Sequence, residues 1–498
     1  MRAMRIVVLG LLALAALVVG RASTGAVPGS TERVSVDSTG NQGNGDSAWA
    51  AISGDGRYVA FGSWASNLVL GDSLGTHDVF VRDRQTGVTA LVSVDSVGNP
   101  GNQHSFYPAI SGDERFVAFE SLASNLVTDD TNGVRDVFVH DRQTATTERV
   151  SMDSAGNQAN SHSYWAAISS DGRYVAFTSA ASNLVPGDTN GKSDVFVHDR
   201  QTGVTERVSV DSSGNQGNDG NYDSAISGDG RYVAFTSVTS NLVPGDTNGE
   251  MDVFVHDRQT GVTERVSVDS AGNQGNSHSF DAAISGDGRY VAFASFASNL
   301  VTGDTNDHDD VFVHDWQTGV TERVSVDSSG NQDNGRSWQS AISADGRHVA
   351  FASEATNLVT GDTNSVTDIF VHDRQTGATE RASVDSAGNE GNSDSFEAAI
   401  SGDGRYVAFQ SEATNLVPGD TNGHEDIFVH DRGSTPPTPT PTPTPAPVGG
   451  IAEYPDVAAP AGGSGPSVEH YALLAGLASV ALVALTAGAW RGRRRWLR

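Results

Sequence analysis

Residues 147–204 read TERVSMDSAGNQANSHSYWAAISSDGRYVAFTSAASNLVPGDTNGKSDVFVHDRQTGV, and this repeating unit of 58 residues decides the fold. Four strand-like pieces, RVSMD, SYWAAIS, RYVAFTS and DVFVHDR, are separated by S-D-G and Q-T-G turn residues. The unit occurs seven times without an insertion, starting at Thr31, Thr89, Thr147, Thr205, Thr263, Thr321 and Thr379. Four short antiparallel strands repeated seven times predict an all-β fold, a seven-bladed β-propeller over residues 31–433.

The order of the pieces predicts how the ring closes. The first strand, TERVSVD at residues 31–37, is of the outermost kind and has no blade before it. The last unit ends at DIFVHDR and lacks an outermost strand. Each end supplies what the other lacks, so the N-terminal strand should complete the seventh blade and remove the exposed sheet edges. An open solenoid is the alternative.

The pieces AISGDGRYVAFxS and DVFVHDRQTG resemble the TolB-type, WD-repeat-like propeller repeat of bacterial proteins. The resemblance is confined to the repeat array. It implies that the AIS piece is the innermost strand, RYVAF the second, DVFVHD the third and TERVSV the outermost. It also implies that the connection between blades and the connection from the second to the third strand emerge on one face.

Charge and composition limit the partners of this chain. It has 498 residues, no cysteine and a formal charge of −30. Residues 31–433 hold 23 of the 31 basic residues and 58 of the 61 acidic ones, which gives this part a charge of −35. So acidic a surface repels phosphate backbones and excludes nucleic acid as a partner. Without cysteine, the fold is held by packing alone.

Both ends of the chain indicate export. Residues 1–26 place two arginines before the apolar run IVVLGLLALAALVVG and a small-residue stretch, the pattern of a secretory signal peptide; an uncleaved anchor is the alternative. Residues 471–490 form an uncharged run of 20 residues, long enough for a transmembrane helix. The basic tail RGRRRWLR at 491–498 should stay cytoplasmic, which places the propeller outside a single-pass cytoplasmic membrane anchor or on the cell surface.

Residues 434–470 form a Pro/Thr-rich stalk and spacer between the predicted propeller and the predicted span. The spacer, span and arginine cluster resemble the tripartite C-terminal sorting signals of bacterial surface proteins. No LPxTG-like motif is present in the sequence. Whether the anchor is retained or processed stays open.

Six histidines precede an aspartate at the same position of the repeat, and the first blade has Arg82 there instead. A His-Asp pair can act as a base and its orienting carboxylate. Six copies with an arginine substitute favour a structural role, so we predict no catalytic residue. The histidines are His140, His198, His256, His314, His372 and His430.

The connection between the second and third strands carries the pattern D-x-N-x-x-x-D in six blades. Oxygen ligands clustered around a glycine turn suit calcium. Asx-turns, in which these side chains bond their own backbone, are the alternative. The candidate calcium ligands are Asp130, Asn132, Asp136, Asp188, Asn190, Asp194, Asp246, Asn248, Asp252, Asp304, Asn306, Asp310, Asp362, Asn364, Asp368, Asp420, Asn422 and Asp426.

Two adjacent columns of the innermost strand differ in character. Alternation along the strand places the first with Ile52, as packing between blades: Ala48, Phe106, Tyr164, Tyr222, Phe280, Trp338 and Phe396. The second column points the other way and changes from aromatic to acidic or amide around the ring: Trp49, Tyr107, Trp165, Asp223, Asp281, Gln339 and Glu397. This asymmetry near the channel mouth predicts a ligand-binding site, with drift at exposed positions as the alternative.

Together these features predict an exported, membrane-anchored propeller that acts as a non-enzymatic binding module for an extracellular protein or carbohydrate. A hydrolase or lyase that acts on an extracellular polymer is the second hypothesis, because propellers host both classes. A structural surface protein stabilised by calcium is the third.

Overall fold

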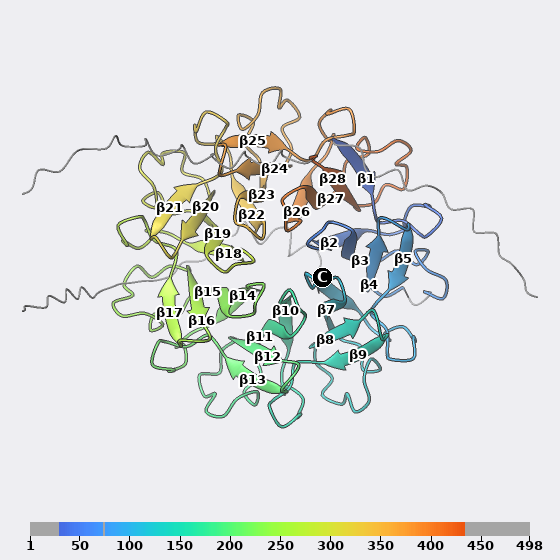
Figure 1. Cartoon of the computed structure of the whole chain (residues 1–498), viewed down its shortest axis with the longest axis vertical. Helices are drawn as coiled ribbons and strands as arrows, with labels where there is room; N and C mark the ends of the chain where they lie inside the picture. Colours follow the sequence, from blue (N-terminus) through green and yellow to red (C-terminus); the bar gives the residue numbers. More distant parts are fainter. Residues whose placement is uncertain (1–28, 73–74, 434–498) are drawn as a thin grey trace, which may run out of the picture.

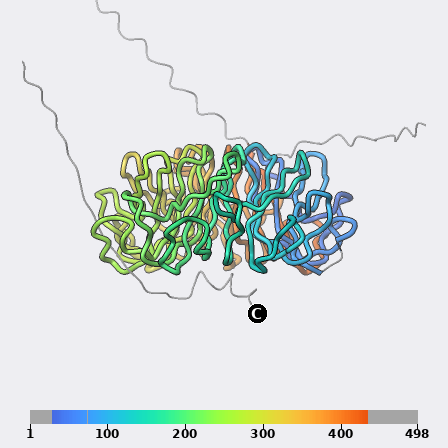
Figure 2. Tube along the Cα trace, turned by 90° about the horizontal axis from the view of Figure 1, so that it is seen from below, coloured from blue at the N-terminus to red at the C-terminus, as the bar shows by residue number. Residues whose placement is uncertain are grey.

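Each blade is a four-stranded antiparallel sheet that takes three strands from one repeat and its outermost strand from the start of another, and seven such sheets surround a central channel in the computed structural model (Figure 1). The structure describes residues 29–72 and 75–433. Seen edge-on, the ring is a flat disc (Figure 2). The all-β, seven-bladed propeller predicted from the repeat is confirmed.

The two strands nearest the channel have the same length in every blade. The innermost strands are β2 (Ser47–Ile52), β6 (Ser105–Ile110), β10 (Ser163–Ile168), β14 (Asn221–Ile226), β18 (Ser279–Ile284), β22 (Ser337–Ile342) and β26 (Ser395–Ile400). The second strands are β3 (Tyr58–Ser63), β7 (Phe116–Ser121), β11 (Tyr174–Ser179), β15 (Tyr232–Ser237), β19 (Tyr290–Ser295), β23 (His348–Ser353) and β27 (Tyr406–Ser411).

The two outer strands complete each sheet. The third strands are β4 (Asp78–Asp83), β8 (Asp136–Asp141), β12 (Asp194–Asp199), β16 (Asp252–Asp257), β20 (Asp310–Asp315), β24 (Asp368–Asp373) and β28 (Asp426–Asp431). The outermost strands are β5 (Val88–Leu91), β9 (Thr146–Arg149), β13 (Val204–Arg207), β17 (Val262–Arg265), β21 (Val320–Arg323), β25 (Ala378–Arg381) and β1 (Ser30–Arg33).

The outermost strands begin and end earlier than the sequence pattern predicts. The piece RVSMD starts at Arg149, where β9 ends. Beyond this point the hydroxyl of Ser151 donates a hydrogen bond to Asp136 and accepts one from the amide of Val137, so a side chain replaces the main-chain ladder. The serine that looks like a strand residue in the sequence therefore ends the strand.

The hydrophobic core lies between neighbouring blades, because each sheet buries both faces. One cluster joins Val137 and Val139 of the second blade to Val175, Phe177 and Phe196 of the third, and all five are fully buried. The pattern returns at every blade boundary, including the boundary between the seventh blade and the first. The core is therefore a ring of seven similar interfaces.

The N-terminal strand closes the ring, as the order of the pieces predicts. Strand β1 pairs antiparallel with β28, and the seventh sheet has the order β1, β28, β27, β26 (Figure 1). Val34, just after β1, is buried in the cluster between the seventh blade and the first. The described residues therefore form no open solenoid.

Ion pairs link neighbouring blades around the rim. The carboxylate of Glu32 in β1 lies 2.7 Å from Arg84 of the first blade, and Glu206 lies 2.6 Å from Arg258 of the next blade. Each glutamate is about half exposed, so a single pair adds little stability. Their regular placement fixes how one blade sits against the next.

The predicted signal peptide, stalk, span and basic tail lie outside the described residues. Within residues 29–72 and 75–433, no helix is long and apolar enough to cross a membrane.

Candidate functional site at the mouth of the central channel

One residue in each innermost strand breaks the register with the second strand. In β2, Ala48 pairs with Gly62 and Ala51 pairs with Ala60, so two residues oppose one. This β-bulge places a residue with a left-handed backbone at the same position of every blade. These residues are Trp49 (φ 57°), Tyr107 (47°), Trp165 (50°), Asp223 (38°), Asp281 (54°), Gln339 (53°) and Glu397 (51°).

The bulge corrects one sequence prediction. Simple alternation places Ala48 on the same face as Ile52, whereas the register places Ala48 on the face of Ala51. The prediction is wrong because the extra residue shifts the phase of the strand by one. The column that contains Ala48 was also predicted to pack between blades. Trp338, the sixth residue of that column, does contact the cluster between the sixth and seventh blades.

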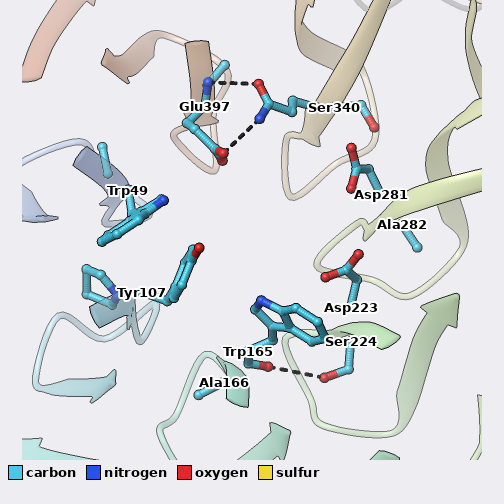
Figure 3. Close-up of a pocket in the computed structure, with 14 residues that line it drawn as sticks. Trp49, Tyr107, Trp165, Ala166, Asp223, Ser224, Asp281, Ala282, Ser340 and Glu397 are labelled. Carbon is cyan, nitrogen blue, oxygen red and sulfur yellow. Dashed lines mark hydrogen bonds between the residues drawn. The ribbon is translucent and has the colours of Figure 1, made fainter. Parts of the chain in front are cut away.

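The seven left-handed residues line one cavity of about 260 Å³ at the channel mouth (Figure 3). Each is half-buried. The remaining lining residues are the ones that follow them: Ala50, Pro108, Ala166, Ser224, Ala282, Ser340 and Ala398. The structure therefore brings together the whole second column that the sequence analysis singled out.

The lining divides into an aromatic arc and an acidic arc, which face each other across the cavity (Figure 3). The aromatic arc consists of Trp49, Tyr107 and Trp165 from the first three blades. The rings of Trp49 and Tyr107 are 4.3 Å apart, centroid to centroid, and form one continuous aromatic surface.

The acidic arc consists of Asp223, Asp281, Gln339 and Glu397 from the other four blades. The amide nitrogen of Gln339 donates a hydrogen bond of 2.7 Å to Glu397, and the main-chain amide of Glu397 donates one of 3.2 Å back to the Gln339 oxygen. This pair fixes one end of the arc. Among residues 29–72 and 75–433, no arginine, lysine or histidine lines the cavity.

The opposite end of the channel is narrowed by backbone contacts between blades. The amide of Ser170 donates to the carbonyl of Gly228, and the amide of Gly228 donates to the carbonyl of Gly286, each at 2.9 Å. A Cβ atom on Gly228 would lie 2.7 Å from the Ser170 hydroxyl, closer than side chains pack. Small residues at this position therefore let the blades meet.

The six histidines of the His-Asp pairs hold blades together. In the third blade, Nδ1 of His198 lies 2.8 Å from the hydroxyl of Thr205, which donates its own proton to the carbonyl of Met152 in the preceding connection. Nδ1 must therefore donate. Arg82 supplies the same donor to Thr89 in the first blade, at 3.0 Å. Burial lowers the pKa of all six histidines, to about 4 for His314.

The aspartates of the predicted calcium sets contact an arginine of the outermost strand. In the third blade, Nη1 of Arg207 lies 3.5 Å from Asp188 and 3.3 Å from Asp194. Asn190 donates to Asp194 at 3.1 Å and accepts from the amide of Lys192 at 2.9 Å, as in an Asx-turn. Arg33, Arg149, Arg265, Arg323 and Arg381 occupy the same place in the other five blades.

The sequence analysis missed these arginines, although they are present in six TER pieces. The first blade contains the sequence evidence that could have identified them: Leu91 replaces the arginine there, and Leu74 replaces the asparagine of the loop. Two substitutions that occur together indicate that the two positions belong to one cluster. Among the described residues, no group of three or more histidines, aspartates or glutamates is arranged to hold a metal ion.

Calcium binding by these loops stays a prediction, and the arginine favours its alternative, the Asx-turns. A guanidinium already lies between the two carboxylates of each set, so calcium must displace it. We therefore expect calcium and magnesium to raise the melting temperature equally at matched ionic strength, by screening alone. A larger shift with calcium, lost in Asp188→Asn with Asp194→Asn, would instead establish specific sites.

A second cavity, of about 350 Å³, lies at the loops between the fourth and fifth blades, where the sequence analysis placed no site. Its walls include Glu250, His278, Phe296 and His308. Nδ1 of His278 accepts a hydrogen bond from the amide of Met251, which orients the ring. No repeat signal marks these loop residues, because they vary from blade to blade.

No protein-family model matches this chain, and no curated protein matches its sequence. Among solved structures, an oligogalacturonate lyase in complex with manganese is similar over 80% of this chain and 92% of its own, with 13% identity and a TM-score of 0.48. The propeller domain of the Trilobed protease from Pyrococcus furiosus covers 78% of this chain and 95% of its own, with 10% identity and a TM-score of 0.48.

TolB from Acinetobacter baumannii, a protein of the type whose repeat the sequence resembles, matches over 71% of this chain and 76% of its own. Its identity is 14% and its TM-score 0.36. The strand order and closure described above establish the propeller fold of this chain without these comparisons.

Proposed function

We propose that this protein is an exported, membrane-tethered binding module, and that the cavity at the channel mouth captures part of an extracellular protein or glycan. The supporting observation is the contrast between the repeats and the lining of this cavity. Almost every structural position is the same in all blades, whereas the left-handed position carries two tryptophans, a tyrosine, a glutamine and three carboxylates. A purely structural ring has no need for such differences.

The backbone at these positions strengthens the proposal. A left-handed conformation disfavours every residue except glycine and, to a lesser extent, asparagine and aspartate. Trp49, Trp165 and Glu397 nevertheless occupy it. Strained positions that keep large or charged side chains are typical of functional sites.

A hydrolase or lyase is the second candidate, because three carboxylates share one cavity. Two carboxyl groups on either side of a glycosidic bond are the usual machinery of glycoside hydrolysis. The His-Asp pairs do not support this candidate, since each histidine is engaged by a threonine between the blades. Cleavage of a bound glycan on prolonged incubation would favour the enzyme.

Glycan and peptide arrays test the binding function directly. We expect the full-length protein to retain a small set of related ligands and Trp165→Ala to lose them, because the indole forms one end of the aromatic arc. Trp316→Ala is the matched control, since Trp316 lies away from the cavity and packs on Tyr232. Equal binding by both variants would place the ligand elsewhere.

The proposed topology has its own test. Protease added to intact cells should release a soluble propeller cut within residues 434–470, because the basic tail is expected to hold the C-terminus inside. Immunoblotting of the medium and the cell pellet measures the release. Complete protection of the propeller in intact cells, with cleavage after lysis, would refute this orientation.

A further inference from the structure

The aromatic arc of the cavity is supported from within the first blade. The ring of His77, just before β4, is buried and lies 5.0 Å from the ring of Trp49, centroid to centroid. Trp49 also packs against Tyr107, and both of these rings line the cavity (Figure 3). His77, Trp49 and Tyr107 therefore form a row of rings that runs from the core of the blade to the cavity.

Gly62 in β3 makes room for this row of rings. A Cβ atom on Gly62 would lie 2.3 Å from Cε1 of His77 and 3.2 Å from Cε3 of Trp49, so a larger residue would displace His77 and press on Trp49. The six residues equivalent to Gly62 in the other blades all carry a side chain: Glu120, Thr178, Thr236, Ala294, Ala352 and Gln410. The six positions equivalent to His77 hold other residue types. The glycine and the buried histidine therefore belong to one arrangement around Trp49.

Hydrogen bonds and further rings fix His77 in place. Its Nδ1 donates to the carbonyl of Ser105 at 2.7 Å, and its main-chain amide donates to Nδ1 of His104 at 3.0 Å. Its ring stacks on Phe106 at 5.0 Å, and Trp64 lies 5.2 Å away on the same cluster. Burial lowers the pKa of His77 to about 4, so the ring is neutral at neutral pH. The row of rings is therefore ordered before a ligand binds, which reduces the free energy lost to ordering on binding.

The opposite wall of the cavity offers hydrogen bonds. A carboxylate accepts about four hydrogen bonds and an amide both donates and accepts more than one, so such groups can bind a hydroxyl group in addition to their contacts within the protein. Gln339 and Glu397 already bond each other and still have this capacity. The polar side chains of this wall are Asp223, Ser224, Asp281, Gln339, Ser340 and Glu397.

A sugar ring is complementary to both walls. The faces of a pyranose ring carry C–H groups that pack on aromatic side chains, and its edge carries hydroxyl groups that donate and accept hydrogen bonds. The cavity volume of about 260 Å³ is near the lower limit of the roughly 300–1,000 Å³ of small-molecule sites, which suits one end of a chain. The charge of −35 on residues 31–433 repels anionic sugars.

We propose that the cavity binds the terminal ring of a neutral glycan, and that Gly62 and His77 are positioning residues that hold Trp49 against Tyr107. The inference rests on the proposed binding function and names the class of its ligand. A glycan is favoured over a protein segment because one sugar ring presents an apolar face and several hydroxyl groups together, within the small volume of the cavity.

Arrays and calorimetry on the full-length protein test the class of the ligand. The array carries neutral, anionic and amino-sugar oligosaccharides beside the peptides. We expect the protein to retain neutral oligosaccharides that share a terminal sugar. In calorimetry, the best of them should bind at least about tenfold more tightly than an oligogalacturonate of the same length, because the acidic protein repels the uronate carboxylates.

Variants of the first blade test the row of rings. Trp49→Ala should weaken binding of that oligosaccharide at least about tenfold, and Trp49→Phe, which keeps a ring, should weaken it less. Gly62→Thr combined with His77→Ser reproduces the pair Thr178 and Ser193 of the third blade. The melting temperature of this double variant should stay near that of the wild type, whereas its affinity should fall at least about fivefold, because Trp49 has lost its support.

Ala294→Thr is the matched control for the double variant. It introduces threonine at the same repeat position in the fifth blade, where the side chain is buried and does not line the cavity. Thr178 and Thr236 show that this position accepts threonine in other blades. The affinity of Ala294→Thr for the oligosaccharide should change less than about twofold.

The outcomes separate this inference from the proposed function. Retention of peptides alone, or of charged sugars alone, would overturn the neutral glycan and leave a binding module in place. Wild-type affinity in Trp49→Ala would overturn the row of rings as the contact surface, and wild-type affinity in the double variant would overturn its support by His77. Failure of every array ligand to bind would overturn the proposed function itself.

Discussion

Deleting residues 29–37 should prevent the propeller from folding as a stable monomer. Strand β1 supplies the fourth strand of the seventh blade, and Val34 behind it is buried in the core. Removal exposes one edge of β28 and opens the boundary between the seventh blade and the first. We expect a loss of at least roughly 5 kcal/mol, comparable with the whole stability of many domains.

The polar contacts of β1 and of the residues just after it explain why the effect exceeds that of losing four strand residues. Arg33 lies 2.9 Å from Asp420 and 3.0 Å from Asp426, and the hydroxyl of Ser35 donates to Asp426 at 2.5 Å. Both aspartates are nearly inaccessible to solvent. Without β1 they lose their cation, and a buried carboxylate without a partner is strongly destabilising.

A variant in which the outermost strand is supplied at the other end of the propeller provides the control for this deletion. Residues 38–432 followed by a copy of residues 201–212 place an outermost strand at the C-terminal end of the seventh blade. The copied segment, QTGVTERVSVDS, contains the turn after the third strand and the outermost strand β13 of the third blade. Thermal unfolding followed by circular dichroism should show a melting temperature near that of the intact protein. An unchanged melting temperature in the simple deletion would contradict closure by β1.

The repeat allowed the fold and the ring closure to be predicted, because a fixed period aligns equivalent residues without any structure. It also located the cavity column, since Trp49 and Glu397 occupy one repeat position yet differ in chemistry. The bulge was not predictable from alternation, because nothing in the local sequence SAWAAI marks a residue for a left-handed backbone. Only the pairing of Ala48 and Ala51 with β3 reveals it.

The role of the arginines in the outermost strands could be identified only from the three-dimensional structure, for a different reason. Arg207 and Asp188 are far enough apart in the chain that the sequence alone does not pair them. From the sequence, the arginine is expected to be an exposed polar residue of a strand. In the structure its side chain is largely buried between two carboxylates. A loop that resembles the start of a calcium site therefore contains its own cation.

Replacing Arg207 by leucine should destabilise the third blade by about 3–5 kcal/mol at pH 8, because Asp188 and Asp194 would then face each other without a cation. The first blade shows this arrangement naturally. Leu91 stands at the arginine position there, and burial together with the charge of Asp78 raises the pKa of Asp72 to about 6.

The destabilisation by Arg207→Leu should depend on pH in a defined direction. Burial already raises the pKa of Asp188 and of Asp194 in the intact protein, and removing the guanidinium raises these pKa values further. A carboxyl whose pKa is higher in the folded than in the unfolded state takes up a proton on folding, so stability increases as the pH falls through the folded pKa. The difference in melting temperature between variant and wild type should therefore shrink from pH 8 to pH 5.

Two further variants make this result specific to the carboxylate pair. Adding Asp188→Asn to Arg207→Leu removes one of the two facing charges and should recover most of the lost stability at pH 8 without affecting the core. Leu91→Arg is the reciprocal change: it should stabilise the first blade, and more at pH 8 than at pH 5, because Asp72 is charged only at the higher pH. A deficit of Arg207→Leu that is the same at both pH values would mean that the arginine acts through packing of its side chain, and that the aspartates are protonated or hydrated throughout.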